Sequence, residues 1–296
     1  MAMDQSTFGD LLYPVQMKRY GLAYNMYPIE YGEFLNVEGS TKAYEESLSL
    51  SGFGLAPVKN SGDSVSYATA KQNWKGRIIH STFGLGYKIT DEMVEDDQTK
   101  IINALPDSLA RSIRVTQEII GANILNNAVV AGHVGPDGQV LGSASHLLGG
   151  GGTWSNLGTA AALSETSLEA ALIAIAGFTD DKGLPIMAKG KKLIIPKELE
   201  FTAIKLLKSM NEYDTANNAV NPMYQIMPYA VNHSLTDPAA WYITTDVPNG
   251  LIWYWRRKDK FSKDGDFDAE VAKFKTTFRC SVGWDDPRGV YVVPGS

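Results

Sequence analysis

The chain has 296 residues, of which 44% are hydrophobic and 20% charged, so it can bury a sizeable core and is not a disordered protein. Its net charge of -6 excludes a strongly basic protein that captures nucleic acid by neutralising phosphates. The single cysteine, Cys280, excludes an intrachain disulfide and a multi-cysteine metal site.

The start of the chain does not have the layout of a targeting segment. Residues 1–10 lack the basic and then apolar order of a signal peptide, and nowhere do 18 apolar residues follow one another. We therefore expect no membrane partner and a protein that is made and used in soluble form.

Residues 1–40 are rich in aromatic side chains, but their helical periodicity is poor. Pro14 and Pro28 interrupt any long helix. The sequence predicts an extended arm whose rings lie on another surface, of the same chain or of a neighbour. The aromatic residues are Phe8, Tyr13, Tyr20, Tyr24, Tyr27, Tyr31 and Phe34.

Residues 47–89 have a strand-like pattern. Segments 47–51, 65–69 and 77–87 are predicted as strands of one long hairpin, with a polar tip at 58–64. Such a hairpin is not stable by itself, so it gains burial by lying across a neighbour or by folding back on its own domain.

A long helix is predicted after this hairpin. Thr90 and Asp91 supply capping oxygens, and apolar residues then recur every three or four positions to Ala128. Pro106 is predicted to kink or split this helix. The early carboxylates could bind a cation, but capping and the helix dipole account for them; they are Glu92, Glu95, Asp96 and Asp97. The apolar stripe consists of Ile101, Leu105, Leu109, Ile113, Ile120 and Ile124.

The second half alternates between helix and strand patterns. A glycine-containing stretch at 129–162 is predicted as loop, including the run of four glycines at 149–152. The predicted helices are 166–178 and 196–210, and the predicted strands are 191–195, 241–245, 251–256, 273–282 and 289–293. The fold class is therefore α+β, with an α/β unit in the middle.

No reaction chemistry is evident in the sequence. Cys280 lies in an apolar run and is expected to be a buried hydrophobe, and the four-glycine run lacks the Gly-Lys-Ser or Gly-Lys-Thr of a phosphate loop. The histidines have no metal-ligand spacing and are expected to be structural or exposed; they are His80, His133, His146 and His233. We predict no catalytic residue, no metal site and no cofactor.

The order of the predicted parts, from an aromatic arm through a hairpin and a long helix to an α/β unit and closing strands, resembles that of the major capsid proteins of tailed bacteriophages. Their fold is shared with encapsulins and the herpesvirus capsid floor. The resemblance covers essentially the whole chain. It rests on Tyr-Lys-Ile-Thr-Asp-Glu at 87–92, His-Leu-Leu-Gly at 146–149 with the glycine loop to 156, Lys-Leu-Ile-Ile-Pro at 192–196, Pro-Asn-Gly-Leu-Ile-Trp at 248–253 and the closing segment 279–289.

The resemblance implies a division into four parts. These are an N-terminal arm at 1–44, an extended loop at 45–89, a peripheral domain with a spine helix at 90–165 and 266–296, and an axial domain at 166–265. It further implies a structural subunit of the virion, assembled in the host cytoplasm into hexamers and pentamers of an icosahedral shell that encloses double-stranded DNA.

The partners expected from the resemblance are other copies of the chain, a portal, decoration proteins and weakly bound packaged DNA. Some relatives carry a scaffolding extension before the arm, and residues 1–44 cannot play that part. The resemblance therefore implies a separate scaffolding protein or a sequence that is already the mature form, and the initiating Met1 favours the separate protein. The resemblance also implies a precursor shell that expands, with the loop and the helix near Pro106 as the moving parts.

Some relatives cross-link a loop lysine to an asparagine of a neighbour. Lys59, Lys71 and Lys75 lie in the corresponding region, but no matched acid and asparagine can be identified, so we expect only inter-subunit contacts there, with Asp63 as a further candidate.

A dense basic stretch includes Arg256, Arg257 and Lys258, with Trp253 to Trp255 beside it. This combination could bind nucleic acid, but four acidic residues dilute it: Asp259, Asp264, Asp266 and Asp268. We expect inter-subunit salt bridges here, with contact to packaged DNA as the alternative.

Two other functions stay open. An encapsulin-like compartment shares the fold and differs in enclosing an enzyme cargo. A soluble α/β enzyme would require a cleft with clustered ionisable groups, which the sequence does not show.

Overall fold

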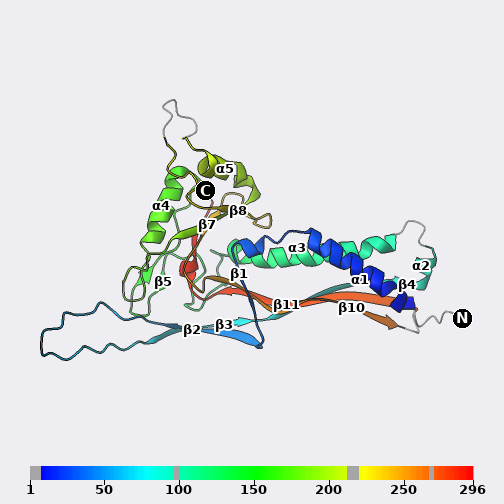
Figure 1. Cartoon of the computed structure of the whole chain (residues 1–296), viewed down its shortest axis with the longest axis horizontal. Helices are drawn as coiled ribbons and strands as arrows, with labels where there is room; N and C mark the ends of the chain where they lie inside the picture. The colour runs from blue at the N-terminus through cyan, green and yellow to red at the C-terminus, as the bar shows by residue number, and fades with distance from the viewer. Residues whose placement is uncertain (1–7, 97–100, 212–219, 267–269, 296) are drawn as a thin grey trace.

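The structure is a computed structural model that describes residues 8–96, 101–211, 220–266 and 270–295. A long base carries an upright unit toward one end, and a thin two-stranded loop projects beyond that end (Figure 1). Residues 1–7 of the predicted arm, and Asp97 and Asp268 of the predicted acidic groups, lie outside the described residues.

The base is built on a four-stranded sheet in the order β1-β10-β11-β4. β10 and β11 form a long antiparallel pair, β4 runs antiparallel to β11, and β1 runs parallel to β10. Alternate residues of β11, including Phe274, Phe278 and Cys280, are buried with side chains of the helices. The strands are β1 (Asn36–Gly39), β4 (Ser81–Thr90), β10 (Leu251–Asp266) and β11 (Val271–Trp284).

Helix α3 (Leu105–Asn126) packs on this sheet through the predicted apolar stripe, of which Leu109, Ile113 and Ile124 are buried. The predicted helix start is confirmed, because Thr90 caps α2 (Asp91–Glu95) by accepting the Met93 N–H. A short 3-10 turn, η3 (Ile101–Ala104), precedes α3.

Pro106 splits the predicted long helix rather than kinking it. It lies in the first turn of α3, where a residue without an N–H disrupts no intrahelical hydrogen bond. Pro106 therefore marks the boundary between η3 and α3, and movement of this region during shell expansion stays a prediction.

The prediction of an extended, non-helical N-terminal segment is wrong. Residues 8–26 form helix α1 (Phe8–Met26) with Pro14 inside it. The face that α1 buries includes Gln16, Tyr20 and Ala23, and the polar Gln16 interrupted the periodicity that would have revealed the helix. Gln16 is satisfied because its Oε1 accepts the hydroxyl of Tyr87 at 2.9 Å.

The aromatic rings of this segment lie on the chain's own body. Tyr20 stacks on Phe261 with centroids 5.1 Å apart, and Tyr31 stacks on Trp253 at 4.3 Å. The turn η2 (Tyr31–Glu33) is fixed by buried Glu118 of α3, which accepts the Tyr31 N–H at 2.9 Å. Residues 8–35 thus cover the base sheet together with α3.

The predicted hairpin exists in shortened form. β2 (Tyr44–Leu50) pairs with β3 (Gln72–Ile79), but the strand predicted at 65–69 is absent from the described residues, since 51–71 contain no strand. Beyond His80 the chain enters the base sheet as β4, so segment 77–87 belongs to two different sheets.

The upright unit is a second four-stranded sheet, β12-β9-β7-β8, with helices α4 and α5. Its core includes the fully buried Leu168, Leu193 and Trp241. The predicted helix 196–210 is shorter, with a 3-10 turn at its start. The elements are α4 (Glu165–Ala176), β7 (Gly190–Ile195), η4 (Lys197–Leu199), α5 (Glu200–Lys208), β8 (Tyr229–Val231), β9 (Trp241–Thr245), η5 (Pro287–Gly289) and β12 (Val290–Val293).

Candidate assembly surfaces

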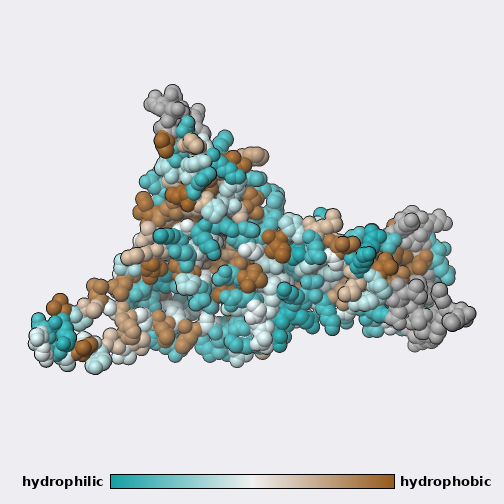
Figure 2. All heavy atoms as spheres, viewed as in Figure 1, coloured by the Kyte–Doolittle hydropathy of each residue, from teal (hydrophilic) through white to brown (hydrophobic). Residues whose placement is uncertain are grey.

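The most exposed part of the molecule is the loop formed by β2, β3 and the residues between them, called here the projecting loop (residues 44–79). Its tip carries large apolar side chains in water: Val58 is 93% and Tyr67 92% exposed. Figure 2 shows such hydrophobic residues along the loop, away from the body. Exposed apolar clusters of this kind mark interaction sites. The others at the tip are Phe53, Leu55 and Val65.

The four loop residues predicted to contact neighbours are all exposed, but they differ in their surroundings. Lys59 and Asp63 lie in the tip, and Lys71 stands where β3 is about to begin, its backbone paired with Ser51. Lys75, on β3, forms an ion pair with Glu46 of β2 at 3.1 Å. An ion pair this exposed contributes little to stability.

The base of the projecting loop is held to the body by polar contacts. The Ser47 hydroxyl donates to Asp285 at 2.6 Å, and the amide of Asn73 donates to Asp181. Burial raises the pKa of Asp285, and the Ser47 hydrogen bond opposes that rise. Gly149 abuts Asn73 so closely that a Cβ would collide with its side chain. The glycine turn between β5 (His146–Leu147) and β6 (Thr153–Trp154) therefore lies against the loop.

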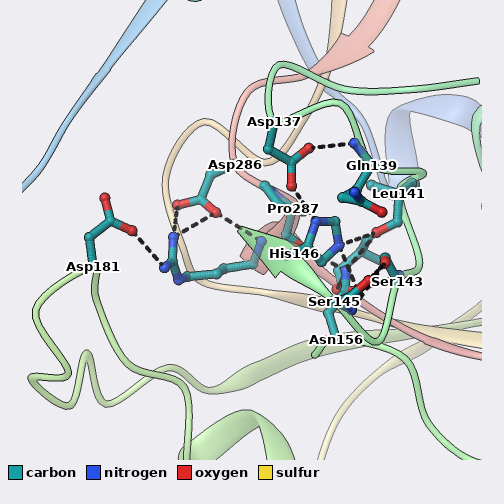
Figure 3. Close-up of polar contacts among 12 residues, drawn as sticks. Asp137, Gln139, Leu141, Ser143, Ser145, His146, Asn156, Asp181, Asp286 and Pro287 are labelled. Carbon is teal, nitrogen blue, oxygen red and sulfur yellow. Dashed lines mark hydrogen bonds and ion pairs between the residues drawn. The ribbon is translucent and has the colours of Figure 1, made fainter. Parts of the chain in front are cut away.

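A buried polar cluster lies beside this base, centred on His146 (Figure 3). His146 Nδ1 is 2.6 Å from Asp137 Oδ2, and Nε2 is 3.0 Å from Asn156 Oδ1. Asn156 Nδ2 donates to the backbone oxygens of Leu141, Pro287 and Val290 at 2.7–3.0 Å. Asn156 thereby joins the loop 134–157 to the C-terminal segment that leads into β12.

Arg288 extends the cluster toward the projecting loop. Its guanidinium donates to the backbone oxygen of Thr179 at 2.9 Å, forms ion pairs with Asp181 and Asp286, and lies 4.6 Å above the Trp154 ring. Asp181 in turn accepts from the loop residue Asn73, so one network connects the loop, the glycine turn and the upright unit.

This cluster is built for structure rather than for a reaction. His146 is fully buried and both of its ring nitrogens face protein acceptors, so no substrate atom reaches it. Burial also raises the pKa of the Cys280 thiol to about 12, which keeps it un-ionised. Among the described residues, no group of three His, Cys, Asp or Glu side chains is placed to hold a metal ion.

The basic stretch lies on β10. Arg256 and Arg257 stand at an irregularity, where the register with β11 shifts between Trp255 and Arg257 and again before Lys260. Lys258 is exposed within it. The neighbouring rings are not a platform for nucleic-acid bases: Trp253 and Phe261 are buried in the core and Trp255 is half-buried against it.

Sequence reasoning missed three parts of these surfaces. The His146–Asp137–Asn156 cluster, Arg288 and the position of Arg279 opposite Arg257 all depend on loop packing or strand register. Within one chain the predicted contact residues form two separate groups, because the loop tip projects from one end while β10 runs to the other (Figure 1).

A family model described as "Phage capsid protein" matches residues 78–293, which includes both sheets apart from β1. The chain belongs to this family. This capsid protein is accordingly a structural subunit of a phage shell, and its place is the virion. No curated protein matches its sequence.

Solved structures show that the capsid protein has the fold of tailed-phage capsid subunits. A chain of "Microbacterium phage Oxtober96" has a TM-score of 0.57 at 10% identity, covering 91% of this chain and 93% of that one. The "Procapsid of bacteriophage JBD30" has a TM-score of 0.54 at 16% identity, covering 97% and 75%. A virus-like particle from Pyrococcus furiosus has a TM-score of 0.55 at 9% identity, covering 95% and 98%.

In the described ranges, no helix of this capsid protein combines the length and apolar character that crossing a bilayer requires.

Proposed function

We propose that this capsid protein is the major shell subunit of a tailed phage and assembles into hexamers and pentamers of an icosahedral shell around double-stranded DNA. The observation that carries the proposal is the projecting loop. Its tip exposes five large apolar side chains that a subunit in isolation cannot bury. Laid across a neighbouring copy, the tip would remove that surface from water.

The contacts are proposed to be heterologous, meaning that two different surfaces of the same subunit meet. Lys59, Asp63, Lys71 and Lys75 would contact one neighbour from the loop, and the basic stretch on β10, with Arg256, Arg257 and Lys258, would contact another. Many modest contacts per subunit add up to a stable shell that can still correct errors during assembly.

The four-part division is proposed with the boundaries given by the sequence: arm 1–44, extended loop 45–89, peripheral domain 90–165 with 266–296, and axial domain 166–265. Two strands depart from these boundaries, since β10 (Leu251–Asp266) lies in the base sheet and β12 (Val290–Val293) in the sheet of the upright unit. Two hydrophobic cores support the existence of a peripheral and an axial body. One is centred on the base and also includes Ile194, Tyr242 and Val290 of the upright sheet, and the other lies in the upright unit. The pairing of β4 with β11 ties the end of the loop segment to the base sheet.

The other partners are a separate scaffolding protein, a portal, decoration proteins and packaged DNA held by weak contacts. Arg256 is half-buried and Arg257 is exposed, and the aromatic rings near them are not exposed for stacking on bases. This favours salt bridges between subunits over binding of nucleic-acid bases.

An encapsulin-like compartment is the second candidate, because the fold also resembles the virus-like particle from Pyrococcus furiosus. The two candidates differ in content and not in shell geometry. Nucleic acid in purified native particles supports the phage head, whereas an enzyme cargo without DNA supports the compartment.

The test is electron microscopy and sedimentation of the chain expressed with the scaffolding protein encoded beside it. Closed shells, tubes or rings of six subunits are expected. A chain that remains a monomer or dimer under these conditions would refute the proposal.

A further inference from the structure

The face of the base sheet turned away from the helices is basic. Across the β10–β11 pair Arg257 lies directly opposite Arg279, and across the β11–β4 pair Lys273 lies opposite Lys88. Directly opposite residues point to the same face, and like charges in that position repel each other. The basic face is defined as Lys88, Arg257, Lys260, Lys273, Lys275 and Arg279.

The positive charge at the centre of this face is not neutralised by the chain's own carboxylates. In the part of the chain that the structure describes, the Nε atoms of Arg256 and Arg279 are buried without a hydrogen-bond partner, and Arg257 donates only to the Thr277 hydroxyl, at 2.9 Å. Burial lowers the pKa of His80, and the nearby charge of Arg279 adds to this effect while Glu45 opposes it.

Three acidic residues share this face: Asp264 stands directly opposite Lys273, Asp266 lies at the end of the β10–β11 pair, and Glu38 of β1 stands opposite Tyr254. Asp266 is already paired with Lys273 at 3.1 Å near the end of the β10–β11 pair. Glu45, whose charge acts on His80 with the opposite sign, is bound to Lys42 at 3.0 Å. The arginines in the middle of the sheet therefore remain available for an external carboxylate.

A matching acidic surface lies at the far end of the base, at α2 (Figure 1). Its three exposed carboxylates, Glu92, Glu95 and Asp96, have no lysine or arginine ion-pair partner among the described residues. Thr82 is opposite Arg279 and Thr90 caps α2, so eight residues of β4, about 26 Å at the rise of a strand, separate Arg279 and its partner Arg257 from the acidic turn. Lys88 and Lys273 lie close to the acidic turn of their own chain, whereas the two arginines are out of its reach.

We propose that Arg257 and Arg279, in the middle of the basic face of one subunit, bind the acidic turn of α2 of a second copy. The acidic turn consists of Glu92, Glu95 and Asp96. The inference rests on the proposed shell function and names the partner of the β10 arginines. Two different surfaces of one subunit are joined, so the contact is heterologous and can be repeated around a ring. Complementary charge fixes which copies meet and in what register.

Charge reversal tests the contact. The base-reversed variant carries Arg257→Glu and Arg279→Glu, the acid-reversed variant carries Glu95→Arg and Asp96→Arg, and a third chain carries all four changes. Each reversal alone is expected to reduce the yield of sedimenting shells by more than about tenfold, because like charges then face each other across the interface. The four-fold variant is expected to recover most of the yield.

A matched control restores the net charge without restoring the contact. It combines the base reversal with Glu169→Arg and Glu198→Arg, two exposed acids of the upright unit. This control is expected to stay defective. The inference is overturned if the control recovers shells, or if the chain with all four changes still fails to form them. In either case the proposed function stands as long as the wild type forms shells. Absence of wild-type shells refutes both.

A second measurement does not depend on how well the reversed variants fold. Arg257→Cys and Asp96→Cys are introduced together, and the assembled shells are treated with a bismaleimide cross-linker, because an arginine and a carboxylate in contact hold their Cβ atoms farther apart than a disulfide allows. The native Cys280 is buried. Covalent chains of subunits on a denaturing gel are expected, and the two single-cysteine variants serve as controls. Shells that form but give no more cross-linking than these controls overturn the inference.

Discussion

Asn156 is the residue whose replacement tests the packing argument most directly. Its side chain is fully buried, and its amide nitrogen faces three backbone oxygens, those of Leu141, Pro287 and Val290. In Asn156→Asp an oxygen replaces the nitrogen without a change of shape. Two N–H donors are lost, and a carboxylate oxygen then lies 2.7–3.0 Å from three carbonyl oxygens.

Each buried acceptor left without a donor costs about 1–3 kcal/mol, so two lost donors amount to about 2–6 kcal/mol. Total stabilities of domains are about 5–15 kcal/mol, so the loss is a large fraction of the free energy of unfolding. Urea denaturation of the unassembled subunit, followed by tryptophan fluorescence, measures it. Asn123→Asp at an exposed position of α3 is the control and should change stability by less than about 0.5 kcal/mol. A loss below about 1 kcal/mol for Asn156→Asp would refute the reasoning.

Three further predictions concern the base sheet, the helices and the loop. Burial raises the pKa of Asp285 in the folded state. Its protonation therefore contributes fully to the free energy of unfolding below about pH 4, the range of an unfolded aspartate, and this contribution is lost as the pH rises through the raised pKa. As the pH rises from about 4 to 7, the free energy of unfolding of Asp285→Asn, measured by urea denaturation, should increase relative to that of the wild type; a difference that does not change with pH contradicts this. Gly121→Ala should lower stability by about 1–3 kcal/mol, because the new Cβ would lie 2.6 Å from Tyr31 Cβ. Gly21→Ala has open space around it in α1 and should raise helix stability by up to about 1 kcal/mol. Equal shifts of the thermal unfolding temperature for the two variants contradict the packing argument. Replacing residues 53–69 by a two-residue turn should change the free energy of unfolding by less than about 0.5 kcal/mol and abolish shells in sedimentation, and shells from this variant would refute the role of the tip.

Much of the fold could be predicted from local pattern. The alternation in β11 and the buried run of β9 follow from their own sequences, and the Thr90 cap identifies the start of α2 without any tertiary information. Helix α1 could not be predicted, because its buried stripe contains Gln16, whose partner Tyr87 is 71 residues away. Here a tertiary hydrogen bond allows a polar residue to lie on the buried face of a helix, so the local sequence pattern looks irregular.

The candidate surfaces were predictable only in part. Exposed lysines in the projecting loop follow from its polar sequence, and the basic stretch on β10 is visible by inspection. That Arg257 faces Arg279 depends on a register shift between strands, and no rule of sequence spacing gives the position of such an irregularity. The Asn156 network likewise joins loop backbone to residues more than a hundred positions away.

The way the projecting loop is attached has a mechanical consequence. It leaves the body through one pair of strands, which are joined to the rest by hydrogen bonds at Ser47 and Asn73 and by the packing of Gly76 on Pro136 and of Ile78 on Gly283. Neither hydrophobic core includes a residue of the loop, so tilting it repacks neither core. A change of angle at this attachment would let one sequence fit both flat and sharply curved positions of a closed surface.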